Sequence, residues 1–454
     1  MNQHNHPKYN RDFLSWKEKD FQTKSSHYNP KYHIFANQGL LNDPNCIFYW
    51  QNQLHIFFQH HPANIEHGLK TMSLATINAN SPKINYQFLV NQPDQNFDSH
   101  GTYSGNAWID DEEIILAYTG NHRDANWNRI SSVVLATFNP ETQKIENKRV
   151  LFNHLDFPDY TDHFRDPFLF KKDGLFYLLL GAQNKNEKGL ILMFELNQTL
   201  DQAKLIKEIH LNDVYRMIEC PAIAWFNEKA VLIYSPQLKL NQLDSKQNPD
   251  LVRYTVIDNW KNLLNDDGLQ ITLSEEKILD YGLEFYAPQT FLINDQWHLI
   301  GWSGIPTSLN YPEAKYGWIF CLSMIKKIEL INQTLILQEA PYLKELYQQD
   351  LDPLIKYYDF DLSKNEILSF LDQDELKLQI QFKNNQIWIE RFNDQTFYPY
   401  QSLVKIDCLV KDQNNLKIYF DHSIIEIKIN ETKWYTSRIY FDKQIDFIIK
   451  NQDE

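Results

Sequence analysis

Cysteine and glycine are both scarce in this chain of 454 residues, which has 4 cysteines and 13 glycines. The cysteines lie far apart and form no C-x-x-C pair: Cys46, Cys220, Cys321 and Cys408. This spacing argues against a zinc site or a disulfide framework. His60 and His61 are adjacent, so on a strand they would face opposite sides and could not share a metal. Motifs of the H-E-x-x-H, G-x-S-x-G and glycine-rich phosphate-loop types are also missing. We therefore expect no metal and no cofactor.

Blocks of positive charge and long apolar runs are missing as well. Lys and Arg number 44 against 59 Asp and Glu, which gives a formal charge of −15. Such a balance argues against nucleic acid or an anionic membrane as partner, but a few local cations could still hold a small phosphorylated ligand. No run approaches the roughly 18 apolar residues of a membrane span, and the first residues lack the apolar core of a signal peptide. We expect a cytoplasmic location, and the oligomeric state stays open.

Aromatic residues are abundant, with 25 Tyr and 28 Phe, and this bias favours strands. One pattern occurs five times: a turn with Pro or Gly, an apolar strand, a short polar turn and a second apolar strand. It covers residues 42–59, 103–120, 165–182, 219–236 and 287–304. Recurrence at intervals of roughly 60 residues predicts a five-bladed β-propeller with one blade per repeat. A β-sandwich with coincidental hairpins is the competing interpretation.

The remaining chain differs in pattern from the repeats. Residues 1–30 are polar and form an N-terminal extension, and the propeller is expected over 31–340. After the last repeat, residues 319–345 are interpreted as a connector. From about Glu375 onward, short alternating strands separated by Asn, Asp and Lys turns suggest a C-terminal β-sandwich, so 341–454 are assigned to a second domain.

Three carboxylates occupy equivalent positions in the repeats, each at or close to a proline. They are Asp43, Asp166 and Glu219. Any one Asp-Pro pair could simply form a turn. Because inner strands of a propeller open at one mouth, however, equivalent positions of different repeats converge in space. Carboxylates without metal-ligand histidines suit glycoside hydrolysis, in which one attacks the anomeric carbon and another protonates the leaving oxygen.

Five segments in order resemble glycoside hydrolase family 32, the invertase and fructosidase family. They are Asn42-Asp43-Pro44-Asn45, Tyr103-Ser104-Gly105, Arg165-Asp166-Pro167, Glu219-Cys220-Pro221 and Tyr286-Ala287-Pro288-Gln289. The resemblance implies a retaining enzyme in which Asp43 is the nucleophile, Glu219 the acid/base and Asp166 the stabiliser of the transition state. It also implies a set of substrate-binding residues: Asn42, Gln59, Tyr103, Ser104, Arg165 and Glu284.

Further segments are similar to the bacterial members of this family that hydrolyse sucrose 6-phosphate. Those segments are 67–70, 98–101, 118–121 and 181–183. We therefore expect this protein to cleave the β-fructofuranosyl linkage of sucrose 6-phosphate and also of sucrose. The phosphate would need cations, and the candidates by position are His67, Lys70, His122, Arg123 and Lys315, of which His67, Lys70 and Arg123 are preferred. Two alternatives stay open: a levan- or inulin-type fructosidase, and a catalytically inactive sugar-binding propeller. Departures from the family pattern include Cys46 for a usual Gly, Met72 for a frequent Trp and Glu284 for an Asp.

Overall fold

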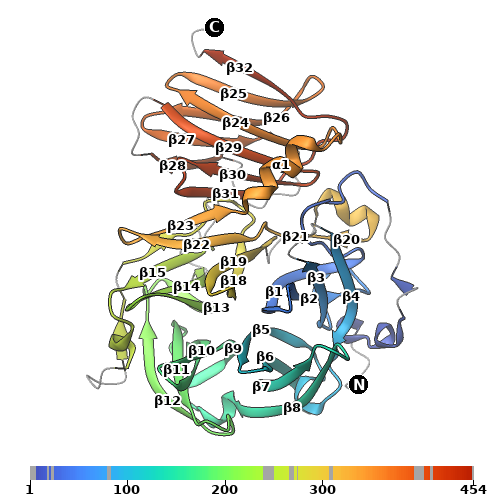
Figure 1. Cartoon of the computed structure of the whole chain (residues 1–454). Coiled ribbons are helices and arrows are strands. Elements are labelled where there is room, and N and C mark those ends of the chain that lie inside the picture. The colour runs from blue at the N-terminus through green and yellow to red at the C-terminus, as the bar shows by residue number, and fades with distance from the viewer. Residues whose placement is uncertain are drawn as a thin grey trace.

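The chain consists of a five-bladed β-propeller followed by a β-sandwich, as predicted (Figure 1). In this computed structural model the described residues are 7–17, 20–21, 25–78, 83–238, 250–264, 270–273, 275–305, 310–392, 403–408 and 413–451. Parts of the expected N-terminal extension (1–6, 18–19 and 22–24) lie outside them. Its described part includes two short 3-10 helices, Pro7–Tyr9 and Asp12–Ser15, and buries Phe13 against the propeller.

The first three blades are built from antiparallel neighbours in chain order. Blade one is β1 (Gly39–Trp50), β2 (Gln53–His61), β3 (Thr71–Asn78) and β4 (Ile84–Asn91). Blade two is β5 (Thr102–Asp110), β6 (Glu113–Arg123), β7 (Arg129–Asn139) and β8 (Lys144–Asn153). Blade three is β9 (Tyr160–Lys172), β10 (Leu175–Asn184), β11 (Gly189–Leu196) and β12 (Ala203–His210), with β16 (Gln270–Thr272) at its edge.

Blades four and five follow the same plan. Blade four is β13 (Tyr215–Phe226), β14 (Lys229–Leu238), β15 (Arg253–Ile257) and β17 (Lys277–Ile278). Blade five is β18 (Tyr286–Ile293), β19 (Gln296–Ser303), β22 (Lys326–Ile331) and β23 (Thr334–Glu339), with β21 (Cys321–Leu322) paired to β19. Short 3-10 helices lie at Asn96–Asp98, His154–Asp156, Trp260–Leu263 and Pro312–Tyr316.

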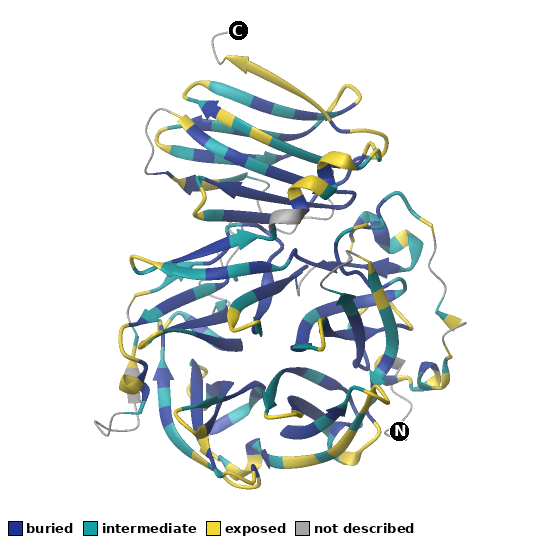
Figure 2. Cartoon of the chain, in the orientation of Figure 1, coloured by how far each residue is buried: buried dark blue, intermediate teal, exposed yellow. Residues whose placement is uncertain are grey.

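The ring of blades is closed by a short strand that lies between β19 and β22 of blade five in sequence. β20 (Trp318–Ile319) pairs in parallel with the start of β1, Gly39 opposite Trp318 and Leu40 opposite Ile319. This two-residue pairing joins the end of the ring to its beginning, as expected of a closed propeller. The inner strands β1, β5, β9, β13 and β18 are largely buried around the centre, whereas exposed residues gather at hairpin turns and outer strands (Figure 2).

The expected connector over 319–345 is wrong, because most of it is strand. β22 and β23 are the outer strands of blade five, and α1 (Pro341–Gln349) follows them. The apolar alternation expected of a strand is hidden here because Lys326 is fully buried in β22. A buried lysine needs ionic partners that only the tertiary structure supplies.

The sandwich consists of two antiparallel sheets, in the orders β24-β29-β30-β31 and β28-β27-β26-β25-β32. Its strands are β24 (Ile355–Ser363), β25 (Glu366–Asp372), β26 (Glu375–Lys383), β27 (Gln386–Arg391), β28 (Leu403–Asp407), β29 (Gln413–Asp421), β30 (Ile424–Ile429), β31 (Lys433–Arg438) and β32 (Asp446–Asn451). The sandwich strands therefore begin about 20 residues before the predicted start at Glu375. β24 was missed because Asp359 and Asp361 interrupt its apolar pattern, although it pairs with β29 along its whole length.

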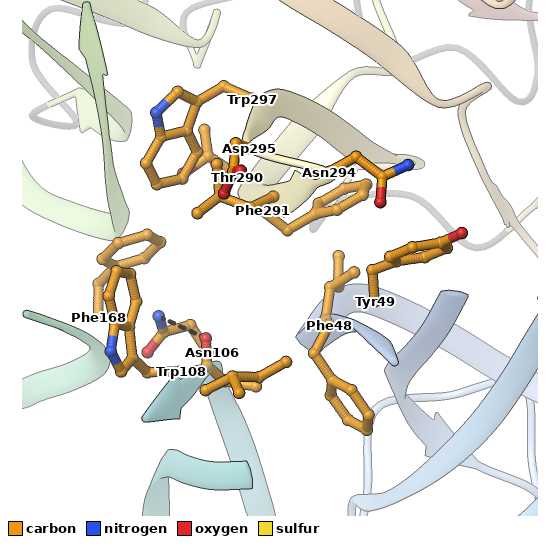
Figure 3. Close-up of a pocket in the computed structure, with 14 residues that line it drawn as sticks. Phe48, Tyr49, Asn106, Trp108, Phe168, Thr290, Phe291, Asn294, Asp295 and Trp297 are labelled. Atoms are coloured by element: carbon orange, nitrogen blue, oxygen red, sulfur yellow. Dashed lines mark hydrogen bonds between the residues drawn. The ribbon is translucent and has the colours of Figure 1, made fainter. Parts of the chain in front are cut away.

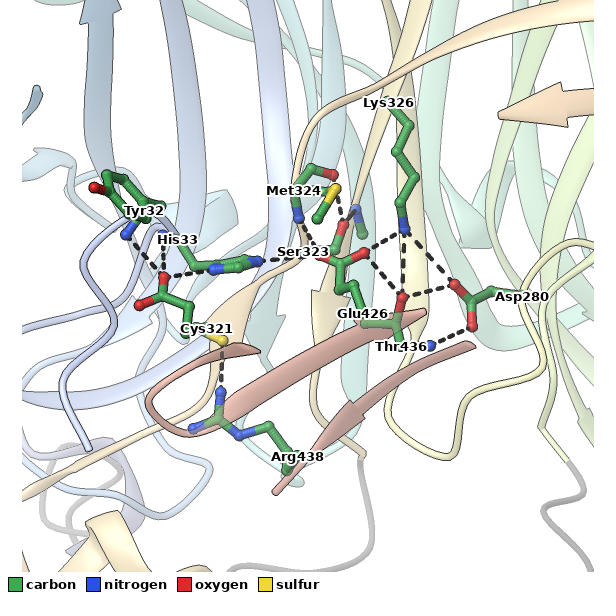
Figure 4. A network of polar contacts seen from close by, with 12 residues as sticks. Tyr32, His33, Asp280, Cys321, Ser323, Met324, Lys326, Glu426, Thr436 and Arg438 are labelled. Carbon is green, nitrogen blue, oxygen red and sulfur yellow. Dashed lines mark hydrogen bonds and ion pairs between the residues drawn. The ribbon is translucent and has the colours of Figure 1, made fainter. Parts of the chain in front are cut away.

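Buried charges join the propeller to the sandwich (Figure 4). The Lys326 ammonium lies 2.5 Å from Glu426 and 3.7 Å from Asp280. His33 lies between Asp421 (2.7 Å) and Glu426 (3.1 Å). All five side chains are at most 2% exposed. Because a buried charge is tolerated only when paired and hydrogen-bonded, each unit supplies groups that the other needs.

Candidate active site

A β-bulge interrupts each of the five inner strands at the same level. The regular pairing with the second strand of the blade breaks at Leu41–Pro44, Tyr103–Gly105, Arg165–Phe168, Glu219–Ala222 and Tyr286–Gln289. Asp166, Cys220 and Ala287 adopt positive φ angles there, of 63°, 46° and 47°. Bulges bend a strand and re-aim its side chains. The repeated turn motifs therefore direct five equivalent positions into one mouth of the propeller.

Three carboxylates from blades one, three and four meet at this mouth. The backbone N–H of Cys220 donates to Asp166 Oδ2 at 3.1 Å, and Cys220 Sγ lies 4.0 Å from Asp43 Oδ2. Arg165 Nη2 donates to Glu219 Oε1 at 2.5 Å, and Arg165 Nε lies 4.0 Å from Asp166 Oδ2. The structure thus brings together the three acids that the repeats placed at equivalent positions.

Asp43 is held by residues of its own blade and of the next one. Ser104 Oγ donates to Asp43 Oδ2 at 2.5 Å and Gln59 Nε2 donates to the same oxygen at 3.2 Å. Burial raises the pKa of Asp43 to about 6, against the hydrogen bond from Ser104, which lowers it. A carboxyl group in this range can change its protonation state near neutral pH.

Glu219 accepts hydrogen bonds on both carboxylate oxygens. Besides Arg165 on Oε1, Tyr286 Oη donates to Oε2 at 2.7 Å and Gln237 Nε2 at 2.5 Å. Burial acts to raise the pKa of Glu219, but the charge and hydrogen bonds of Arg165 hold it below its usual range. Burial raises the pKa of Asp166 to about 7 in spite of Arg165. In the free site the lowest pKa therefore belongs to Glu219.

The expected phosphate contacts are divided between two places. Lys70 is buried, with its ammonium bonded to Asn42 Oδ1, and burial lowers the pKa of Lys70 to about 7. Burial also lowers the pKa of His67 to about 2, so its imidazole is neutral at pH 7. Arg123 lies instead on blade two, where its Nη1 donates to the carbonyl of Trp127 at 3.1 Å.

Glu284 does not contact the three carboxylates and lies in the interface with the sandwich. Its Oε2 accepts hydrogen bonds from Arg391 Nη1 at 2.8 Å and Ser437 Oγ at 2.5 Å, and Tyr311 Oη donates to Oε1 at 3.2 Å. The side chain is 1% exposed. Tyr286, two residues later, is the side chain that points to Glu219. Glu284 therefore links the propeller to the sandwich through its hydrogen bonds.

Several polar neighbours of the acids were not predicted. Gln237 bonds Glu219, His163 contacts Arg165 at 2.8 Å, and Thr119 Oγ1 accepts the backbone N–H of Asp166 at 2.8 Å. A sequence signal exists for Gln237 and Thr119, because each lies near the end of the second strand of its repeat, where Gln59 lies in blade one. For His163 the signal is its position two residues before Arg165 on the same strand.

Cys46 and Met72 both belong to the packing between blades one and two. Cys46 has a φ of 41°, a conformation that glycine adopts most easily, which accounts for the Gly usual at this position. The Cys46 side chain is fully buried in one cluster with Phe57, Met72 and Tyr118. The cysteine therefore fills space between the blades at a backbone position that suits glycine.

A pocket of about 430 Å³ lies farther along the inner strands, beyond the carboxylates (Figure 3). Trp108, Phe168 and Trp297 contribute much of its lining. Two of its polar side chains donate hydrogen bonds to backbone carbonyls. Asn106 Nδ2 donates to the carbonyl of Leu169 at 2.8 Å, and Thr290 Oγ1 donates to the carbonyl of Ile223 at 2.9 Å. The lining contains none of the three carboxylates, so the pocket is separate from the candidate active site.

Residues 33–341 match the family model described as the glycosyl hydrolases family 32 N-terminal domain. This chain belongs to glycoside hydrolase family 32. Family 32 relatives named sucrose-6-phosphate hydrolase match along most of the chain. The one from Streptococcus mutans is 30% identical over 97% of this chain and 96% of its own length. The one from Lactococcus lactis is 30% identical over 93% and 91%.

Solved structures of family 32 members share the fold. The sucrose-6-phosphate hydrolase from Lactobacillus gasseri superposes with a TM-score of 0.80 at 27% identity, over 96% of this chain and 95% of that one. A β-fructofuranosidase from Bombyx mori superposes with a TM-score of 0.75 at 20% identity, over 94% and 92%. Among the described residues of the family 32 chain, no helix is long and apolar enough to cross a membrane.

Proposed function

We propose that this family 32 protein is a retaining β-fructofuranosidase that cleaves sucrose 6-phosphate and also sucrose. The observation that carries the proposal is the meeting of Asp43, Asp166 and Glu219 at one mouth, through bulges in three different blades. The names of the relatives from Streptococcus mutans and Lactococcus lactis support the phosphorylated substrate.

In the first step, Asp43 attacks the anomeric carbon of the fructosyl unit and forms a covalent ester, while Glu219 gives a proton to the departing glucosyl oxygen. In the second step, Glu219 takes a proton from water, which then cleaves the ester and releases fructose. Asp166 in its ionised form carries negative charge beside the developing oxocarbenium ion and accepts hydrogen bonds from fructosyl hydroxyls. Asn42, Gln59, Ser104, Tyr103 and Arg165 complete the fructosyl subsite.

The first step requires a proton on Glu219 and none on Asp43. In the free site the pKa values have the reverse order, because the pKa of Glu219 is lower than that of Asp43. We propose that substrate hydroxyls accept hydrogen bonds from Arg165 and weaken its bonds to Glu219. The pKa of Glu219 then rises, because the cation that held it down is engaged elsewhere. Because the three carboxyls interact closely, their proton can redistribute within the group when the substrate binds.

The charge of a phosphorylated disaccharide restricts the cellular compartment in which the enzyme can meet it. A phosphate ester is too strongly charged to cross an apolar bilayer unaided, so it stays in the compartment in which it is made. We propose a cytoplasmic location on this ground. Cell fractionation followed by an activity assay tests it: activity in the extracellular or membrane fraction would contradict the proposal.

The decisive assay measures fructose release from sucrose 6-phosphate, sucrose and inulin with the wild type, Asp43→Asn and Glu219→Gln. We expect hydrolysis of both disaccharides, little action on inulin, and losses of about 10²–10⁴-fold or more in either variant. Melting curves show whether each variant is folded. Preference for inulin would favour a polymer-cleaving fructosidase, and an inactive but sugar-binding wild type would favour a binding propeller.

A further inference from the structure

Two arginines lie opposite each other at the end of the hairpin that joins β6 and β7 of blade two. Arg123, the last residue of β6, pairs directly with Arg129, the first residue of β7. Like charges directly opposite each other in an antiparallel pair destabilise the sheet. In a chain with a formal charge of −15, this local excess of positive charge calls for a physical reason.

The pair lies on the same sheet face as residues of the active site. Thr119 accepts the backbone N–H of Asp166, and Asn121 Nδ2 donates to Tyr103 Oη at 3.2 Å. Alternate residues of a strand share a face, so Thr119, Asn121 and Arg123 point the same way. Arg123 lies four positions after Thr119, which is about 13 Å along the strand. The arginines therefore lie beyond the residues that contact Asp166 and Tyr103, and we expect the leaving glucosyl part of the substrate to extend toward them.

Both guanidinium groups have a buried Nε–H that makes no hydrogen bond to the described residues. Arg129 Nε lies 3.9 Å from Asp162 Oδ2, and the Asp162 side chain is 41% exposed, so this ion pair is weak. Trp127, in the turn between them, lies under Arg123 with 5.9 Å from its guanidinium carbon to the ring centre.

We infer that Arg123 and Arg129 together form the subsite for the phosphate group of the substrate and determine the preference for the phosphorylated sugar. The inference rests on the proposed function. Guanidinium groups bind phosphate oxygens in pairs, and a dianion between them removes the repulsion of the arginine pair. Lys70 and His67 are poor alternatives, because Lys70 is buried against Asn42 and His67 is neutral.

The test compares kcat/KM for sucrose 6-phosphate and for sucrose in the wild type, Arg123→Gln and Arg129→Gln. We expect each variant to lose about 10–100-fold on the phosphorylated substrate, as for a lost hydrogen bond to a charged group. On sucrose each should stay within about threefold of the wild type. Arg149→Gln is the control, because it also removes one positive charge but lies on the outer strand β8. The one side-chain hydrogen bond described for Arg149 goes to the carbonyl of Leu200. This variant should change neither value.

A second measurement separates this inference from the proposed function. Inorganic phosphate should raise the melting temperature of the wild type and of Arg149→Gln. The increase should be much smaller for Arg129→Gln. This readout does not need hydrolysis, so it supports the subsite even if the proposed activity is absent. Equal losses on both sugars, unchanged kinetics, or phosphate stabilisation that survives in Arg129→Gln would overturn the inference.

Discussion

Ser104 Oγ donates a 2.5 Å hydrogen bond to Asp43 Oδ2, although the two residues belong to different blades and lie 61 positions apart. Gln59 donates to both groups, at 3.2 Å to Asp43 Oδ2 and at 2.5 Å to Ser104 Oγ. The ionisation of the proposed nucleophile therefore depends on the relative position of blades one and two. A change in the packing of these blades would change the pKa of Asp43.

Replacement of Ser104 by Ala should move the acidic limb of the pH profile of kcat/KM to higher pH. The hydrogen bond from Ser104 favours the ionised form of Asp43, so its loss raises the pKa of Asp43 above about 6. A shift of about one pH unit corresponds to the lost hydrogen bond to a charge. Ser369→Ala in the sandwich, where Ser369 bonds Gln379, is the control and should leave the profile unchanged. An unshifted limb in Ser104→Ala would show that Ser104 does not set this pKa.

Replacement of Gly105 by Ala should both destabilise the protein and reduce its activity. A Cβ at this position would lie 1.9 Å from the carbonyl oxygen of Ala117 and 2.6 Å from the Cα of Tyr118. The backbone must move to relieve these contacts, at a cost of about 1–3 kcal/mol or more, and the adjacent Ser104 moves with it. Chemical denaturation and kcat/KM measure the two effects.

Gly174 offers the matched control for this glycine. It has a φ of +82°, and among the described residues, its two chain neighbours apart, a Cβ at this position would meet no atom within 4 Å. Gly174→Asn should therefore cost less than about 1 kcal/mol and preserve activity, because Asn tolerates the left-handed conformation. Equal behaviour of the two variants would mean that the close approach of β5 and β6 at Gly105 is unimportant.

Replacement of Glu284 by Gln should reduce stability without weakening sugar binding. Glu284 pairs with Arg391 at 2.8 Å, and both side chains are 1% exposed. Breaking a buried pair leaves an uncompensated charge and costs about 3–5 kcal/mol. Asp213→Asn, which removes the exposed partner of Lys188, should cost less than about 1 kcal/mol. A raised KM for sucrose at unchanged stability would instead support Glu284 as the sugar contact that its sequence position suggests.

The stability of the interface between the units should depend on pH through His33. Burial acts to lower the pKa of His33, but hydrogen bonds to Asp421 and Glu426 raise it to about 9. Since this pKa exceeds the ordinary 6.5, His33 stabilises the fold fully below pH 6.5, and the contribution is lost as pH rises through 9. Melting temperatures between pH 6 and 10 should therefore fall in the wild type.

The variant His33→Gln should melt at lower temperature near neutral pH and lose this alkaline decline. His27→Gln, which removes a more exposed partner of Asp442, is the control and should keep it. A wild-type melting temperature that is constant from pH 6.5 to 9 would contradict the role of His33.

The sequence alone was sufficient for the five hairpins, because each blade begins with two strands joined by a short turn and its apolar pattern is local. It also singled out Asp43, Asp166 and Glu219 through the equivalence of the repeats. Prediction failed where a charge inside a strand interrupts the pattern, as at Lys326 in β22 and Asp359 in β24.

The partners of the charged groups were decided by the tertiary structure alone. Glu284 lies two residues before Tyr286, yet Glu284 joins the sandwich while Tyr286 bonds Glu219. The pairing of Glu219 with Arg165 and of Asp43 with Ser104 likewise connects different blades. Local sequence determines which side chains can ionise, but burial and distant neighbours determine their pKa values, because both depend on how the blades close around the mouth.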